Sequence, residues 1–165
     1  MTAMTRRMAL AIIAQLAAAA SLAACGMNNE EGALAPDEGS TEIETLASVA
    51  YDIMPYESVR PELYVRAAEA MLAGNRTLAT NGLAMLRQVT GDRRWMDLKE
   101  AEQVAALTAV QDSDFFAFMR STTINTLFVD PQVWDMVGYG GSAVEHGGYI
   151  DRGFNDIDWL PTGSE

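Results

Sequence analysis

The chain has 165 residues, of which 49% are hydrophobic, 21% charged and 8% aromatic, a balance typical of one folded domain. Eleven lysines and arginines against 23 aspartates and glutamates give a net charge of −12, which disfavours a protein that binds the phosphate backbone of nucleic acids. The single cysteine, Cys25, excludes an intrachain disulfide, a Cys-x-x-Cys redox pair and a zinc site built from several cysteines.

Residues 1–24 have the pattern of an export signal peptide outside the folded domain. Arg6 and Arg7 precede an alanine-rich apolar run over residues 8–24 that carries no acid. This run of 17 residues is short and weakly hydrophobic for a bilayer core about 30 Å thick, so a signal peptide is favoured over a single transmembrane anchor.

The end of this run, Leu22-Ala23-Ala24-Cys25, resembles a bacterial lipobox. The small residues allow a peptidase to reach the backbone, and the cysteine sulfur receives the lipid. The pattern predicts lipidation of Cys25 and a mature chain that begins there, anchored to a membrane on the periplasmic side. A lone cysteine that follows the signal by chance is the alternative.

The residues Thr5-Arg6-Arg7-Met8-Ala9-Leu10 also resemble a twin-arginine signal. That export route carries proteins that are already folded, often with a cofactor or a partner bound, and the weakly apolar, alanine-rich core suits it. The alternative is that Arg6 and Arg7 only supply the positive charge of a general export signal.

Residues 25–40 contain the cysteine and many turn-forming residues without periodicity, so they are expected to form a flexible tether. A capping box at residues 41–44, Thr-Glu-Ile-Glu, predicts a helix that ends at Pro55. Its inward face is expected to hold apolar residues at helical spacing: Ile43, Leu46, Ala47, Ala50 and Met54.

A second helix is expected from Pro61 to Gly74-Asn75, with Leu63, Ala67, Ala70 and Met71 inward. A third is expected over residues 78–89 and ends at Gly91. The Asn81-Gly82 pair weakens it by about 1 kcal/mol relative to alanine.

Three further helix starts follow. Asp97 is expected to cap a helix, with Ala101, Val104, Ala105 and Thr108 on its inner face; Ser113 caps one with Phe116, Met119, Thr123 and Leu127 in line; and Asp130-Pro131 starts a short one through Met136. The fold class is therefore an all-α domain over residues 41–136, a bundle of five or six helices.

Residues 137–165 differ in composition from the helical part. Glycines alternate there with aromatic residues, which a disordered tail seldom contains. The rings of Tyr149, Phe154 and Trp159 are expected to pack against the bundle or against a partner. As a docking element, the tail would use these three anchors, and Arg152 would pair with a carboxylate of the partner.

No catalytic or metal-binding constellation is convincing. The only histidine, His146, lies close in sequence to Ser142 and Glu145, and residues so near rarely converge into a triad. The loop at residues 138–141, Gly-Tyr-Gly-Gly, follows a helix instead of a strand and has no phosphate-binding lysine. The oxygen-bearing side chains Asn155, Asp156 and Asp158 lack the pattern of a calcium loop. We expect no catalytic, cofactor or metal residues in this chain, and the catalyst to be another protein.

Over about residues 41–161, the chain resembles the gluconate 2-dehydrogenase subunit 3 family, the small subunit of membrane-associated flavoprotein dehydrogenases. The residues that carry the resemblance are Arg94-Trp95-Met96-Asp97-Leu98, Glu100 to Gln103, Phe115-Phe116, Met119-Arg120, Thr122-Thr123, Asp130-Pro131-Gln132-Val133-Trp134, Val137-Gly138-Tyr139-Gly140-Gly141, Gly147-Gly148-Tyr149, Arg152-Gly153-Phe154 and Asp156-Ile157-Asp158-Trp159-Leu160-Pro161.

The resemblance implies a three-part enzyme that oxidises a sugar or polyol. A large subunit of the glucose-methanol-choline type would hold FAD, a c-type cytochrome would accept the electrons, and this small subunit would carry the export signal for the large one. Many members of the family have a twin-arginine signal without a lipobox, and this chain differs from them in that respect. A self-contained periplasmic lipoprotein, either a ligand binder or a structural protein of the envelope, is the alternative function.

Overall fold

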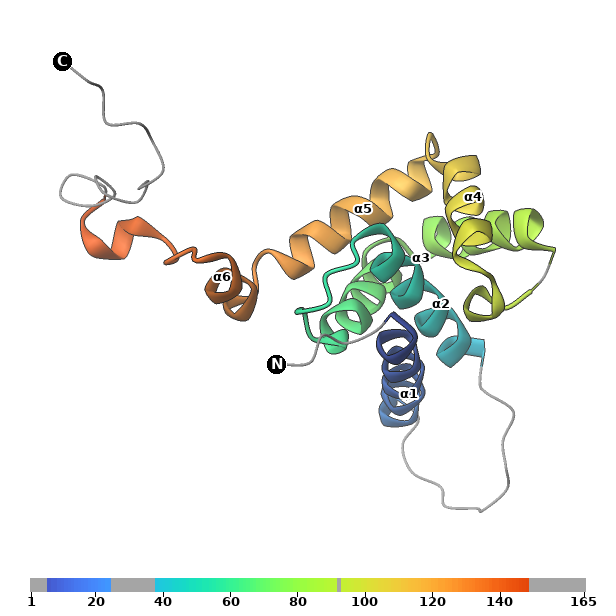
Figure 1. Cartoon of the computed structure of the whole chain (residues 1–165), viewed down its shortest axis with the longest axis horizontal. Helices are drawn as coiled ribbons and strands as arrows, with labels where there is room; N and C mark the ends of the chain where they lie inside the picture. The colour runs from blue at the N-terminus through green and yellow to red at the C-terminus, as the bar shows by residue number, and fades with distance from the viewer. Residues whose placement is uncertain (1–5, 25–37, 92, 149–165) are drawn as a thin grey trace.

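The computed structural model describes residues 6–24, 38–91 and 93–148, and over these ranges all regular structure is helical (Figure 1). The all-α prediction is confirmed. In chain order the elements are α1 (Arg6–Ala24), α2 (Glu38–Ile53), α3 (Pro61–Thr90), the 3₁₀ helix η1 (Trp95–Asp97), α4 (Glu100–Val110), α5 (Asp114–Leu127), α6 (Pro131–Val137) and the 3₁₀ helix η2 (Ala143–His146).

The long helix α3 is the centre of the bundle, and α2 and α5 pack along it. Two tyrosines of this core, Tyr51 and Tyr64, meet edge to face with 5.2 Å between ring centroids. The Tyr64 hydroxyl donates to the Met54 carbonyl oxygen over 2.7 Å, and burial raises the pKa of this phenol. Tyr64 therefore remains a neutral donor that ties the end of α2 to the start of α3.

The predicted start of α2 is wrong, whereas its end is confirmed. The helix begins at Glu38, so Thr41 lies inside it and lacks the extended backbone of a cap; its carbonyl oxygen instead accepts the Thr45 hydroxyl over 2.8 Å. The helix ends at Ile53, just before Pro55. The predicted inner residues Leu46, Ala47 and Ala50 are fully buried.

The predicted boundary at Gly74-Asn75 is a kink within α3. Asn75 has non-helical dihedrals, φ −151° and ψ 81°, and its Oδ1 accepts the Leu78 amide over 3.0 Å. The backbone of Asn75 therefore interrupts the helix, and its side chain caps the segment that follows. The helix terminates at Gly91, as predicted, in a left-handed conformation with φ 67° that favours glycine.

Gly82 has a packing role that the sequence did not indicate. It is buried on α3, and a Cβ atom placed there would lie 1.9 Å from Cδ2 of Phe115, a buried residue of α5. The Phe115 ring therefore occupies the space that a side chain at position 82 would fill. The glycine that weakens α3 as an isolated helix allows α3 and α5 to approach closely.

The predictions for α4 are wrong in both its cap and its inner face. Lys99 occupies the cap position, not Asp97, which lies in η1, and the Lys99 amide donates to the Glu102 carboxylate over 2.8 Å. The buried residues are Gln103, Ala106 and Val110, while Val104 is 57% exposed. With alanines on several faces, helical spacing did not single out the buried one.

The caps of the last two α-helices are confirmed. The Ser113 hydroxyl accepts the Phe116 amide over 3.2 Å, and the Asp130 carboxylate accepts the Gln132 amide over 3.0 Å. The buried row of α5 consists of Met119, Thr123 and Leu127, as expected, but begins at Phe115, since Phe116 is only half-buried.

The segment interpreted as an export signal forms α1, which packs against α2 and α3 in the unprocessed chain (Figure 1). The expectation that it lies apart from the fold therefore does not describe this structure. Four of its apolar residues are buried: Ala9, Leu10, Ile13 and Ala17. Among the described helices, none has the length and apolarity that a bilayer crossing requires.

Glu102 gives the stability of α4 a dependence on pH. The hydrogen bond from the Lys99 amide, assisted by Arg93, lowers the pKa of the Glu102 carboxyl. A lowered folded-state pKa stabilises the fold above the unfolded pKa, and this stabilisation is lost as pH falls through the folded value. We expect Glu102→Gln to lower the melting temperature slightly at about pH 7 and not below about pH 3.

The measurement is thermal unfolding by circular dichroism across this pH range. Glu69→Gln on the exposed face of α3 is the control and should follow the wild-type curve at every pH. A Glu102→Gln deficit that persists unchanged in acid would contradict the assignment.

Candidate partner-binding site

Residues 128–148, here called the arm, extend beyond the end of α5 and include α6 and η2 (Figure 1). The base of the arm is held to the start of α3 by Asp130. Its Oδ2 lies 3.5 Å from Nη1 of Arg66, and its Oδ1 lies 3.9 Å from Nη2 of Arg60. Val133 is buried beside this attachment. The base of the arm therefore contacts the bundle, whereas its outer part extends away from the other helices (Figure 1).

Aromatic contacts order the middle of the arm. Phe128 meets Tyr56 edge to face at 6.0 Å, and the Phe128 carbonyl oxygen accepts the Trp134 indole N–H over 2.6 Å. Trp134 in turn meets Tyr139 edge to face at 5.4 Å. The left-handed turn at Gly138, with φ 73°, returns the chain so that these two rings can meet. Phe128 therefore joins the arm to the loop between α2 and α3, whereas Trp134 and Tyr139 support each other within the arm.

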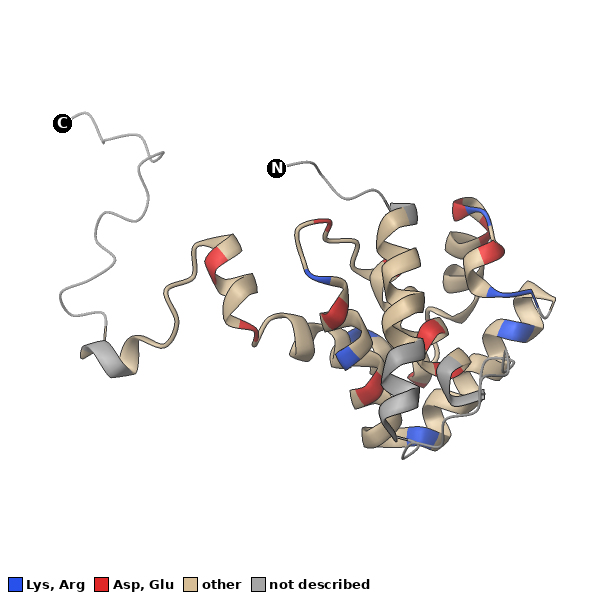
Figure 2. Cartoon of the chain, turned by 90° about the horizontal axis from the view of Figure 1, so that it is seen from below, with Lys and Arg blue, Asp and Glu red and all other residues tan. Residues whose placement is uncertain are grey.

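Apolar side chains remain exposed along the outer part of the arm. They come from two short stretches of chain: Met136 with Val137 and Tyr139, and Val144; Val129, at the base of the arm, is exposed as well. Val144 is 85% exposed. Figure 2 shows that this part of the molecule is mostly uncharged, and residues 128–148 contain no lysine or arginine. Exposed apolar side chains gathered on one segment are typical of an interface.

The sequence-predicted partner-binding residues Tyr149, Arg152, Phe154 and Trp159 lie outside the described residues, as does Cys25. The described arm ends at Gly148, directly before them. The backbones of Arg6 and Arg7 form the first turn of α1. The described residues therefore end immediately before most of the predicted docking tail.

The weak catalytic candidates gain no support from the described geometry. The Ser142 hydroxyl accepts the Val144 amide over 3.3 Å and caps η2, which is a structural role. The glycine loop at residues 138–141 follows α6, as the sequence indicated. Among residues 6–24, 38–91 and 93–148, no three His, Cys, Asp or Glu side chains are grouped to hold a metal ion. Asn155, Asp156 and Asp158 fall outside these ranges.

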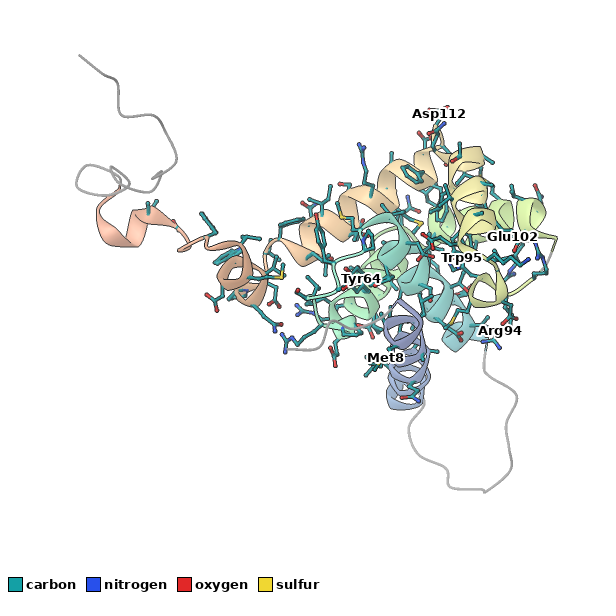
Figure 3. All side chains as sticks on the ribbon, viewed as in Figure 1. Met8, Tyr64, Arg94, Trp95, Glu102 and Asp112 are labelled. Atoms are coloured by element: carbon teal, nitrogen blue, oxygen red, sulfur yellow. The ribbon has the colours of Figure 1, made fainter. Side chains whose placement is uncertain are left out.

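A small cavity that sequence reasoning missed lies between α2, the end of α3 and η1. Its volume is about 170 Å³, and its lining combines apolar side chains with three arginines: Leu83, Leu86, Trp95 and Met96 with Arg87, Arg93 and Arg94, besides Thr41, Glu44, Thr45 and Thr90. Figure 3 shows Arg94, Trp95 and Glu102 at the same end of the bundle. The sequence feature that could have indicated this cavity is the cluster of basic residues between positions 87 and 99 in an otherwise acidic chain.

Carboxylates already neutralise two of these arginines. Nη2 of Arg94 lies 2.9 Å from Oε1 of Glu44, and Nη1 of Arg93 lies 2.9 Å from Oε1 of Glu102. Arg93 also donates through Nε to the Thr90 carbonyl oxygen over 3.1 Å. The basic side chains therefore hold the loop before α4 to α2 and α3, and an anion would compete with their present partners.

A shallower groove of about 240 Å³ lies where α2, α4 and α5 meet. Its apolar lining includes Ile53, Val104, Leu107 and Phe116, with Asp52 at one side. The Asp52 carboxylate accepts the Trp95 indole N–H over 2.7 Å, so this acid has a structural role at the groove.

Comparisons of the chain with protein-family models, with curated proteins and with solved structures found no match. The interpretation of the arm therefore depends on its own chemistry: a partly aromatic segment with three acids and no lysine or arginine, in contact with the bundle at its base and with apolar side chains exposed at its outer part.

Proposed function

We infer that this chain is a non-catalytic small subunit that binds, escorts through export and stabilises a large FAD-dependent dehydrogenase acting on a sugar or polyol. The observation that carries the proposal is the arm, whose exposed apolar side chains lead directly into the glycine- and aromatic-rich tail. Exposed apolar side chains gathered on one segment favour the binding of a partner that would cover them.

The arm suits docking because its base is anchored. Burial of Val133, with a smaller contribution from the surface ion pairs of Asp130 to Arg60 and Arg66, holds this base, so binding a partner sacrifices less conformational freedom than ordering a free chain would. In this proposal the tail from Gly147 to Pro161 is the principal docking element, and the arm extends the same surface to the bundle. Tyr149, Phe154 and Trp159 would supply the anchors.

The export role depends on the first 25 residues. Arg6 and Arg7 would direct a folded complex to the twin-arginine route, as an FAD protein that folds around its cofactor requires. A lipid on Cys25 would hold the complex at the periplasmic side of a membrane, where a c-type cytochrome subunit accepts the electrons. FAD and haem c would belong to the partners.

Co-purification of a yellow flavoprotein tests the docking surface. We expect Val137→Lys on the arm to weaken binding by about tenfold or more, because a charge would enter an apolar interface. Val104→Lys on α4 is the matched control, since both valines are 57% exposed and both lie on helices. Truncation after His146 should leave the helical content near wild type and abolish co-purification.

Retention of the flavoprotein by both the Val137→Lys variant and the truncated chain would refute docking through the arm and tail. Loss with Val104→Lys alone would place the interface on α4 instead.

Replacing Arg6 and Arg7 together with lysine tests the escort. The change keeps the positive charge that a general signal requires, so only twin-arginine recognition should be lost. We expect both this subunit and its flavoprotein to accumulate in the cytoplasm, measured by fractionation and flavin fluorescence. Undiminished export would indicate the general route, which carries unfolded chains and cannot transport a folded flavoprotein.

A self-contained lipoprotein that binds a small ligand is the second candidate. The cavity of about 170 Å³ lined by Trp95, Leu86 and three arginines favours it, since apolar walls with a few charged groups are typical of ligand sites. Purification of the chain alone from its native source, without a flavoprotein, would support this candidate over the first.

A further inference from the structure

Over residues 8–17, one face of α1 is buried. Ala9, Ile13 and Ala17, each four residues apart, are 0% exposed, and Leu10 is 7% exposed. The opposite face is open, with Met8 57% exposed. A helix with one buried stripe and one exposed face is an integral member of a bundle.

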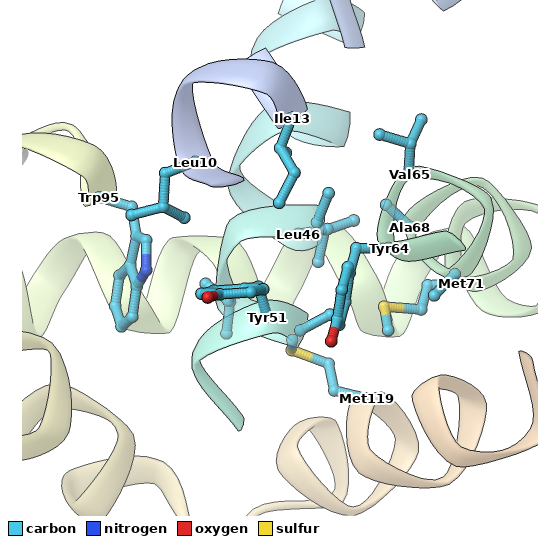
Figure 4. Close-up of a cluster of buried hydrophobic side chains, with 14 of the residues drawn as sticks. Leu10, Ile13, Leu46, Tyr51, Tyr64, Val65, Ala68, Met71, Trp95 and Met119 are labelled. Atoms are coloured by element: carbon cyan, nitrogen blue, oxygen red, sulfur yellow. The ribbon is translucent and has the colours of Figure 1, made fainter. Parts of the chain in front are cut away.

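The surface of α2 and α3 that α1 covers, here called the seat, is part of the hydrophobic core of the domain. In Figure 4, Ile13 points from α1 toward Leu46 of α2, and Val65 and Ala68 of α3 lie on the other side of the seat. Ile13, Leu46 and Ala68 are wholly buried, and Val65 is 6% exposed. Ile13 therefore fills its part of the core completely, and a smaller side chain at position 13 would leave a cavity between α1 and its neighbours.

The buried stripe lies within the apolar run that an export machinery or a membrane would have to contact. Residues 9–17 cannot pack against α2 and α3 and at the same time enter a translocase or a bilayer. The packed state and the export-competent state therefore exclude each other. The free energy of packing α1 onto α2 and α3 sets the equilibrium between the two states.

We propose that the seat on α2 and α3 binds the export segment in the folded precursor and masks it, so that release of α1 is a required step of export. The proposal rests on the export role of residues 1–24 in the proposed function. It adds an intramolecular contact that delays export until α1 leaves its seat.

The first test measures the contact directly in the purified, full-length precursor. In a Cys25→Ser background, Ala9→Cys places a thiol in the buried contact of α1 with the core, and Gln15→Cys places one on the exposed face of the same helix. We expect a water-soluble maleimide to label position 15 at least about tenfold faster than position 9, with the difference lost in urea. Equal labelling of the folded precursor would overturn the proposal.

The second test measures the consequence for export. Ile13→Ala removes a fully buried side chain of the core cluster, whereas Ile12→Ala makes the same change at a partly exposed position of α1. Both changes lower the hydrophobicity of the signal by the same amount, but only Ile13→Ala removes a fully buried contact, so that variant should release α1. We expect the Ile13→Ala variant to be labelled faster at a thiol introduced by Ala9→Cys, and to be exported several-fold faster than the Ile12→Ala variant.

Equal export rates for the two alanine variants would overturn the masking proposal, even if position 9 is protected from labelling. The failure of the proposed function is distinguishable, because the replacement of Arg6 and Arg7 by lysine tests the route and does not alter maleimide labelling of the purified precursor.

Discussion

Replacing Gly82 with alanine is expected to destabilise the domain by about 2 kcal/mol, although alanine is the better helix former. The added Cβ would lie 1.9 Å from Cδ2 of Phe115, so α3 and α5 must separate or the ring must leave its position. Overpacking of this kind costs about 1–3 kcal/mol or more, and the gain in helix propensity offsets about 1 kcal/mol. Urea unfolding followed by circular dichroism measures the net effect.

Gly74→Ala is the matched control on the same helix. A Cβ atom there would meet Cζ of Phe118 at 3.8 Å, an ordinary contact, so this change should be neutral or stabilise by up to about 1 kcal/mol. Combining Gly82→Ala with Phe115→Leu should cost less than the sum of the two single changes, because the smaller side chain relieves the clash. Additive effects would show that residue 82 and residue 115 do not meet.

Trp95→Ala is expected to be the most destabilising single change at the junction of α2, η1 and α4, by about 3–5 kcal/mol. Trp95 is buried in the core cluster, its indole N–H donates to Asp52, and its carbonyl oxygen accepts the Gln103 side chain over 2.8 Å. The change would remove the ring and one donor to the Asp52 carboxylate while the backbone contact remains. Thermal and urea unfolding measure the loss.

Two comparisons separate packing from hydrogen bonding. Trp95→Phe keeps an aromatic ring and loses the indole donor, so it should cost less, about 1–3 kcal/mol. Trp134→Ala removes a half-buried tryptophan of the arm, which contacts Tyr139 and Phe128, and should leave the stability of the bundle nearly unchanged. Similar losses for Trp134→Ala and Trp95→Ala would mean that the arm belongs to the core.

The candidate site could be anticipated only in part. The glycine and aromatic content of residues 137–165 predicts from composition a segment that packs against the bundle or against a partner, because rings of this number require a surface to pack against. The exposure of Val137 and Val144 and the anchoring of Asp130 by Arg60 and Arg66 could not be anticipated. The two arginines precede Asp130 by 70 and 64 residues, and no local pattern pairs them.

By itself the sequence determined the helical class and most helix ends. Pro55, Gly91, Ser113 and Asp130 act on their own backbone neighbours through fixed dihedrals or side-chain caps, so their effects are local and readable. Only the tertiary structure decided which face of α4 is buried, why Gly82 lies inside α3, and that α1 packs into the bundle. These features depend on the shape of surfaces far apart in the chain, and helical periodicity contains no information about those surfaces.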